Sequence, residues 1–325
     1  MDQLYPLLCV PHCQPRIWGG RRLAELYGKA LPPDEPIGET WEVADLPEGH
    51  STIGNGRWQG AALGEVVAAW GGALIGSAWP AGRFPLLVKL LDAQDDLSVQ
   101  VHPSDDDCAR LFPTHHGKDE SWVILHSEAG SILHGAVEGQ DWERFAAALA
   151  ADRALDCLRR VEVAPGDVFR VAPGTIHALG RGVVVLEIQQ PSDSTFRLYD
   201  YGRGRQLHLE ESRQVICWDS SPEPRALPRP LPATWGGREL LVDVPAYRLE
   251  RLRLEREATW SIDPRSVQCL TVLSGRGRLA GADLTLSPGR TILVPAQLGR
   301  VTITPDEPLT VVLAGAGGVP LAEAC

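Results

Sequence analysis

Short runs of β-favouring residues that end at glycine or proline recur along the whole chain. They include FPLLVKLL (84–91), LSVQVH (97–102), SWVIL (121–125), DVFRV (167–171), VVVLEIQ (183–189) and YRLERLRL (247–254). Together with 33 glycines and 26 prolines in 325 residues, this spacing is typical of a sandwich or barrel rather than of alternating strands and helices. Apolar positions at helical spacing predict helices over residues 61–70, 141–160 and 209–217. The sequence therefore predicts a mainly β fold with a few attached helices.

A proline-rich stretch separates two groups of these runs. Residues 220–235, SSPEPRALPRPLPATW, contain five prolines, which favour an extended linker. Beyond it, SPGRTILVPA (287–296) echoes APGDVFRVAP (164–173). The echo predicts two related β domains, an N-terminal one over residues 1–219 with the helical insertions and a C-terminal one over residues 236–325. The second copy does not continue to a histidine, so the C-terminal domain is expected to lack metal ligands.

The charge balance limits the kinds of partner. A formal net charge of −11 without any cluster of Lys and Arg argues against nucleic acid or an anionic membrane as the main partner. An anionic small molecule remains compatible, because a few cations in a cleft outweigh a net charge that salt screens over roughly 8 to 10 Å. The expected partner is therefore a small molecule, bound by a monomer or a small homo-oligomer.

The N-terminus and the cysteines indicate a cytoplasmic protein. The opening residues MDQLYPLLCVPHC have no basic segment and their apolar stretch is broken by prolines, so no signal peptide is expected. No run approaches the ~20 apolar residues that span a bilayer. The seven cysteines are odd in number and lack C-x-x-C spacing, which favours reduced thiols.

The segment LSVQVHP alternates apolar and polar residues. On a strand, Gln100 and His102 share a face and lie ~6 to 7 Å apart, and on this strand alone a solvated polar face is the more ordinary interpretation. Glu120, which precedes the run SWVIL, and His177, which follows a Pro-Gly turn, alter that interpretation. The four residues offer two imidazoles, a carboxylate and an amide oxygen, a set that suits Zn²⁺ with an open position and that Fe²⁺, Mn²⁺ and Co²⁺ also accept.

Several segments carry a resemblance to a known family. They are PLLVKLLDAQDDLSVQVHPSD (85–105), GKDESWVIL (117–125), PGDVFRVAPGTIHAL (165–179) and QQPSDSTFRLYDYGR (189–203). These segments resemble type I mannose-6-phosphate isomerase in its short bacterial form, which belongs to the cupin superfamily. The resemblance implies two cupin-type β-barrel (jelly-roll) domains. It also implies one zinc ion per chain, bound by Gln100, His102, Glu120 and His177.

The same resemblance implies a reaction, the reversible interconversion of mannose 6-phosphate and fructose 6-phosphate through a cis-enediol(ate). Zinc would act as a Lewis acid or an orienting template, since nothing is hydrolysed. Lys118 is a candidate proton donor, although a solvated surface lysine is an equally good interpretation. Arg197 offers a forked cation, and Asp193 is either a proton carrier or a turn residue.

A sugar phosphate also needs cations for its dianion. The candidates are Arg197, Lys89 in the apolar run 84–91, and Arg203, because Arg and Lys are the usual phosphate partners. Ser98 lies on the same strand face as Gln100 and is a further candidate for contact with the substrate.

Two other functional classes stay open at this level. The two-histidine, one-carboxylate set also suits another metal-dependent cupin enzyme such as an iron oxygenase. A non-catalytic sugar-binding cupin is the third class, which a damaged ligand set would favour.

Overall fold

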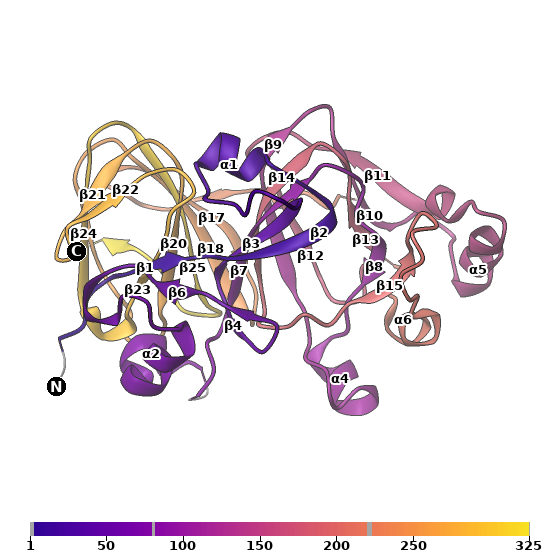
Figure 1. The fold of residues 1–325 in the computed structure, drawn as a ribbon, viewed down its shortest axis with the longest axis horizontal. Coiled ribbons are helices and arrows are strands. Elements are labelled where there is room, and N and C mark those ends of the chain that lie inside the picture. The colour runs from indigo at the N-terminus through magenta and orange to yellow at the C-terminus, as the bar shows by residue number, and fades with distance from the viewer. Residues whose placement is uncertain (1–2, 80–81, 220–222, 325) are drawn as a thin grey trace.

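A computed structural model describes residues 3–79, 82–219 and 223–324. Two β-rich lobes lie side by side (Figure 1), one built largely from the C-terminal segment and the other from the middle of the chain. The strands nearest the N-terminus run between the two lobes and join both. The predicted mainly β fold with few helices is confirmed. No helix within the described ranges is long and apolar enough to cross a membrane.

The N-terminal β unit consists of a six-stranded sheet and a five-stranded sheet. The first has the order β12-β9-β14-β7-β3-β2 and the second the order β11-β10-β13-β8-β15. Their strands are β2 (His12–Gly20), β3 (Ile37–Val43), β7 (Leu87–Ala93), β8 (Val99–Val101), β9 (Glu120–Ser127), β10 (Ser131–Ala136), β11 (Leu158–Glu162), β12 (Val168–Val171), β13 (His177–Leu179), β14 (Val183–Gln189) and β15 (Phe196–Tyr199).

The C-terminal β unit also has two main sheets, with the orders β16-β17-β18-β25-β20-β23-β1-β6 and β22-β21-β24-β19-β26. Their strands are β1 (Leu7–Val10), β6 (Thr52–Ile53), β16 (Arg229–Pro230), β17 (Gly236–Asp243), β18 (Tyr247–Leu254), β19 (Ala258–Ser261), β20 (Gln268–Ser274), β21 (Gly277–Leu279), β22 (Leu284–Leu286), β23 (Thr291–Val294), β24 (Arg300–Pro305), β25 (Leu309–Ala316) and β26 (Glu323–Ala324). A separate ribbon pairs β4 (Asp45–Leu46) with β5 (Gly49–His50).

The two units repeat one strand order. The order β12-β9-β14-β7 in the first unit matches β23-β20-β25-β18 in the second, and all five strands of the smaller sheets match in the same way. The echoing segments therefore occupy equivalent strands, β12 and β23. Each of these strands follows a turn whose glycine has a positive φ, +93° at Gly166 and +80° at Gly289, a conformation that favours glycine.

The N-terminal strands do not follow the predicted domain boundary. Strand β1 pairs with β23, with Leu7 opposite Leu293, and β6 extends the same sheet by pairing with β1. An unpaired edge of β23 would expose its backbone groups, and β1 covers this edge while burying Leu7 and Cys9. Residues 7–10 and 52–53 thus belong to the C-terminal sheet rather than to the predicted domain 1–219. We still propose that the main division between the two units lies in the linker.

The described part of the predicted linker contacts both units. Ser220, Ser221 and Pro222 lie outside the described residues. Beyond them, Arg225 forms a bridge with Phe169, β16 pairs with β17, and Trp235 is buried. The prolines of this stretch prevent long strands, yet Arg225, β16 and Trp235 are each held against a neighbouring element.

The three predicted helices are confirmed as α2 (Leu63–Trp70), α5 (Trp142–Ala150) and α6 (Leu209–Val215). The second is shorter than the predicted range 141–160, because the chain passes through a 3-10 turn, η2 (Ala154–Cys157), and then pairs as β11 with β10. The remaining helical elements were not predicted. They are α1 (Arg22–Tyr27), η1 (Gly56–Trp58), α3 (Gly72–Ile75), α4 (Asp105–Leu111) and η3 (Ala296–Leu298).

Candidate metal centre

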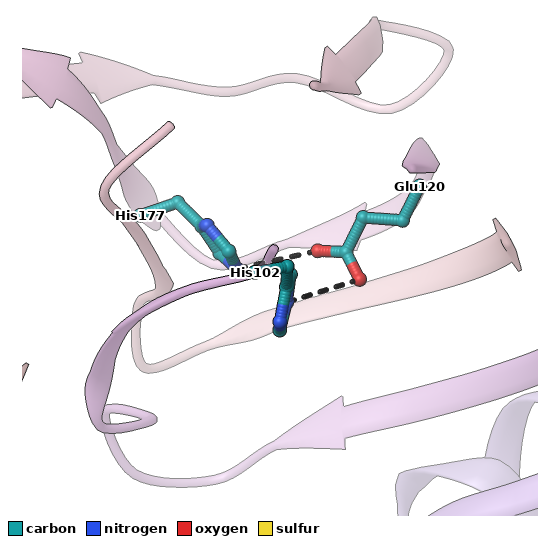
Figure 2. Close-up of side chains that lie close together, drawn as sticks. All are labelled: His102, Glu120 and His177. Atoms are coloured by element: carbon teal, nitrogen blue, oxygen red, sulfur yellow. Dashed lines mark ion pairs between the residues drawn. The ribbon is translucent and has the colours of Figure 1, made fainter. Parts of the chain in front are cut away.

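Three side chains converge between the two sheets of the N-terminal unit. His102 follows β8, Glu120 begins β9 and His177 begins β13. The Nε2 atoms of His102 and His177 lie 3.5 and 3.3 Å from the two carboxylate oxygens of Glu120. Figure 2 marks these two ion pairs with dashed lines. All three residues are buried, and their possible ligand atoms lie within 4.8 Å of one another.

Strand pairing and one turn bring these residues together. In the smaller sheet His177 lies directly opposite Gln100, while Glu120 comes from the larger sheet, where it pairs with Val171 and Gln189. Gly174, with φ +82°, closes the turn before His177 and donates its backbone N–H to the carbonyl of His102 at 2.9 Å. The Nε2 atom of the Gln100 amide lies 3.2 Å from Nε2 of His177.

Backbone carbonyls orient both imidazoles. Nδ1 of His102 lies 2.8 Å from the carbonyl oxygen of Ser194, and Nδ1 of His177 lies 2.9 Å from that of Thr175. Because a carbonyl only accepts, each Nδ1 carries the proton and each Nε2 presents a lone pair. Among the described residues, His102 Nε2 and Glu120 Oε1 are buried without a hydrogen-bond partner, and Glu120 Oε2 has only its ion-pair contacts with Lys118 and His102. Buried acceptor atoms in this arrangement fit a cation better than a closed hydrogen-bond network.

The electrostatics favour neutral imidazoles beside an ionised carboxylate. Burial lowers the pKa of His177 to about 3, and burial together with nearby Lys118 lowers the pKa of His102. Burial alone would raise the pKa of Glu120, but Lys118 and the two imidazoles outweigh it and hold this pKa well below its ordinary value. These are the protonation states that metal ligands require.

A cavity of about 480 Å³ lies next to the three residues. Its wall contains Gln100, which contacts His177, and Lys118, whose Nζ lies 2.9 Å from Glu120 Oε2. Five cationic side chains line the cavity, those of Arg16, Lys89, Lys118, Arg197 and Arg205. The cavity is therefore suited to an anionic ligand despite the chain's negative net charge.

The predicted catalytic residues all lie on this cavity. Lys118 is only 4% exposed, so its interpretation as a solvated surface lysine is wrong. Arg197 donates from Nε to Ser98 Oγ at 3.2 Å and from Nη1 to the Gln206 carbonyl at 2.9 Å. Asp193 is exposed and lies where the cavity meets a second, larger hollow of about 910 Å³.

Lys89 lies on the cavity wall inside a buried cluster of charges. Its Nζ is 3.2 Å from Glu187 Oε1 and 3.6 Å from Glu39 Oε2. The indoles of Trp122 and Trp41 donate to these carboxylates at 2.9 and 2.6 Å. Sequence reasoning missed both glutamates. For Glu187, the single charge within the apolar strand β14, directly opposite Lys89 on β7, was a usable signal.

Each charge in this cluster has a shifted pKa. Burial would lower the pKa of Lys89, but Glu187 and Glu39 outweigh it and raise this pKa. Burial would raise the pKa of Glu39, but Lys89 and Arg16 lower it to about 2. Glu187 differs from Glu39, since burial and then the charge of Glu120 raise its pKa.

Of the two arginines near residue 204, the cavity is lined by Arg205 and not by the predicted Arg203. Arg203 donates to Asp95 at 2.6 Å and to the Asp96 carbonyl at 2.7 Å. Arg205 is held by Asp200, with Nε 2.9 Å from Oδ2. These arginines follow β15 in an irregular segment, where no periodic pattern shows which side chains face the cavity. The sequence therefore held no signal that favours Arg205 over Arg203.

The equivalent place in the C-terminal unit is filled by an indole. Gln268 begins β20 and pairs with Val294 as Glu120 pairs with Val171. It accepts a hydrogen bond from Trp260 Nε1 at 3.1 Å, and Trp260 is fully buried. The indole therefore fills the place that corresponds to the metal centre of the first unit. It also satisfies the side chain of Gln268, the residue that corresponds to Glu120.

Two repeated β units, one of which holds a buried His–Glu–His group beside a cationic cavity, define a cupin-type protein with a candidate metal centre. The sequence model of the family "Phosphomannose isomerase type I, catalytic domain" matches residues 4–123. The chain is 35% identical over 311 residues to the probable mannose-6-phosphate isomerase GmuF of Bacillus subtilis, an alignment that covers 92% of this chain and 96% of that protein. The chain belongs to the type I mannose-6-phosphate isomerase family.

Solved structures share the whole fold. The mannose 6-phosphate isomerase from Bacillus subtilis superposes with a TM-score of 0.86 at 29% identity, covering 95% of this chain and 99% of that one. A zinc-bound mannose 6-phosphate isomerase has a TM-score of 0.80 over 96% of this chain and 99% of its own. At 18% identity, the second likeness is one of fold.

Proposed function

We propose that this protein interconverts mannose 6-phosphate and fructose 6-phosphate, with one zinc ion per chain. The observation that carries the proposal is the convergence of His102, Glu120 and His177 beside a cationic cavity, in a chain whose relatives are named mannose-6-phosphate isomerases. The iron oxygenase and the non-catalytic cupin have no such support from the family.

The ligands of the zinc ion would be His102, Glu120, His177 and Gln100. Two nitrogens, a carboxylate and an amide oxygen suit Zn²⁺ and leave room for a substrate oxygen. Glutamine amides are nearly symmetric in shape, so half a turn about the amide would present the Gln100 oxygen. When bound, zinc supplies a Lewis acid that polarises the sugar carbonyl.

The phosphate dianion would be bound by the arginines of the cavity wall. Arg197 and Arg205 each retain guanidinium N–H groups beyond those bound to the protein, and these suit phosphate oxygens. Ser98 holds the Arg197 side chain by accepting from Nε. Lys89 remains a candidate from the sequence, but two carboxylates already surround its ammonium group. We therefore assign it first to the orientation of Glu187.

Proton transfer between C1 and C2 needs groups that hold and release a proton beside the sugar. Glu187 is suited to accept this proton and return it, because burial raises its pKa above the ordinary value for a carboxyl. Lys118, which is buried against Glu120, would donate to the developing oxyanion. Asp193 at the mouth of the cavity would exchange protons with solvent or orient a neighbour.

The test combines metal analysis with a coupled assay for fructose 6-phosphate formed from mannose 6-phosphate. His177→Ala should lose zinc and activity together, because two remaining protein ligands and an amide do not support normal affinity. His126→Ala, at a half-buried site on β9 that faces Glu128, is the matched control and should keep both. A wild-type protein that holds zinc but lacks isomerase activity would overturn the proposed reaction, and oxygen consumption with bound iron would favour an oxygenase.

A further inference from the structure

The hydroxyl of Tyr247 reaches from the C-terminal unit to the strand that carries Glu120. Tyr247 begins β18 and its side chain is fully buried. The hydroxyl donates to Asp119 Oδ1 at 2.9 Å and lies 2.8 Å from Ser121 Oγ. One group from the second unit therefore contacts the residue before Glu120 and the residue after it.

These contacts lie behind the metal centre. Alternate side chains of an extended chain point to opposite sides, so Asp119 and Ser121 project away from the side that Lys118 and Glu120 share. The front of the segment carries the 2.9 Å contact between Lys118 and Glu120. The back is held by Tyr247, so a shift of the peptide in either direction would lengthen one of its two hydrogen bonds.

Further contacts make this attachment rigid. Asp119 also accepts from Arg170 Nη2 at 2.5 Å, and its backbone N–H donates to Gln190 Oε1 at 2.9 Å. Burial, and then the charge of Asp119, raise the pKa of Tyr247 well above its ordinary value, so the phenol stays protonated and able to donate. Tyr247 is the member of this group that comes from the second unit.

We infer that Tyr247 is a positioning residue for the metal centre, whose hydroxyl fixes residues 119–121 so that the carboxylate of Glu120 meets both imidazoles. The inference rests on the proposed metal site. It assigns the C-terminal unit a part in metal binding although Trp260 fills the place that corresponds to the centre in that unit. Partners that orient ligands in this way typically change metal affinity by about 10-fold to 100-fold when removed.

The test is Tyr247→Phe in the full chain, which removes the hydroxyl and keeps the ring. The zinc dissociation constant of the metal-free protein is measured by competition with a chromophoric chelator, next to its thermal unfolding without metal. We expect zinc to bind about 10-fold more weakly. Tyr5→Phe is the matched control and should leave the constant unchanged. It removes a hydroxyl that accepts from the Trp58 backbone N–H at 3.1 Å and that forms no hydrogen bond with residues 119–121 in the described part of the chain.

Ser121→Ala provides a second, independent variant. It removes the other partner of the hydroxyl and should also weaken zinc binding, and the two effects should fall short of adding in the double variant, because both changes act on one contact. Lower thermal stability with an unchanged zinc constant in Tyr247→Phe would make Tyr247 a core residue only and overturn the inference. Should Tyr247→Phe fail to fold, an unchanged constant in Ser121→Ala would overturn it equally. A wild-type chain that binds no zinc would instead overturn the proposed metal site.

Discussion

The ammonium group of Lys89 lies between two buried carboxylates of the cavity wall, so the removal of its charge tests this arrangement directly. Lys89→Met keeps the length of the side chain and removes its charge. The buried carboxylate of Glu187 then loses its nearest cation, while Glu39 keeps its ion pair with Arg16 at 2.7 Å. Breaking a buried ion pair in this way leaves uncompensated charge, which is far more costly than replacing the whole pair.

The size of the effect follows from the distances. At separations of 3.2 and 3.6 Å, each attraction is about 5 kcal/mol at an effective dielectric constant of about 20. The cost of removing the ammonium group from water offsets a large part of this sum. We therefore expect Lys89→Met to lower the free energy of unfolding by about 3–5 kcal/mol, and to raise the pKa of Glu187 further, since Lys89 holds that pKa down.

The assay is urea unfolding followed by tryptophan fluorescence, together with the pH profile of turnover. Lys89→Met should lower the free energy of unfolding. The acidic limb of its turnover–pH profile should move to higher pH. Lys89→Met combined with Glu187→Gln should recover at least about 1 kcal/mol, because the unpaired charge of Glu187 is then gone. Lys29→Met is the matched control. It removes a buried ammonium group 2.6 Å from Glu42, outside the cavity, and should destabilise the protein without moving the pH profile.

One result would refute this reasoning. If Lys89→Met changed the free energy of unfolding by less than about 1 kcal/mol and raised only the KM for sugar phosphate, Lys89 would be a phosphate ligand. Its contacts with the two glutamates would then contribute little.

Two further predictions concern the centre and the cavity. Acid should destabilise the metal-free protein. Between pH 6.5 and about pH 3, the imidazole of His177 is protonated in the unfolded chain but not in the folded chain. The free energy of unfolding therefore falls as the pH falls through this window, by up to about 1.4 kcal/mol per pH unit. Urea unfolding across this range should show a smaller slope for His177→Gln. Arg205→Ala should raise the KM for mannose 6-phosphate about 10-fold, the loss of one charged hydrogen bond, with steady-state kinetics as the measurement and Arg203→Ala as the unaffected control.

Both predictions have a clear opposite outcome. If the free energy of unfolding of the wild-type chain and of His177→Gln fell equally steeply with falling pH, His177 would take up its proton in the folded state as well. A larger increase in KM for Arg203→Ala than for Arg205→Ala would place the phosphate on Arg203, as the sequence alone proposes.

Much of the local structure was predictable because it depends on neighbouring residues. The run 183–189 forms β14 over the same residues, and the run 247–254 forms β18 over the same residues. The helix predicted over 141–160 was too long, because residues 158–162 gain more by pairing with β10 than the helical periodicity offers alone. Helix α4 was missed since it is short, but Ser104 at its start accepts from the Asp107 N–H at 3.0 Å, an N-cap that the letters S-D-D-D suggest.

By itself, the sequence determined the candidate ligands and the secondary structure around them. Strand alternation places Gln100 and His102 on one face, and a turn glycine precedes His177; both are local constraints that can be deduced from neighbouring letters. Only the tertiary structure decided which cations face the cavity, that Lys118 is buried, and that β1 completes the sheet of the distant C-terminal unit. These features arise from pairing and packing between segments far apart in the chain, such as Leu7 with Leu293 and Lys89 with Glu187, and no local pattern specifies such partners.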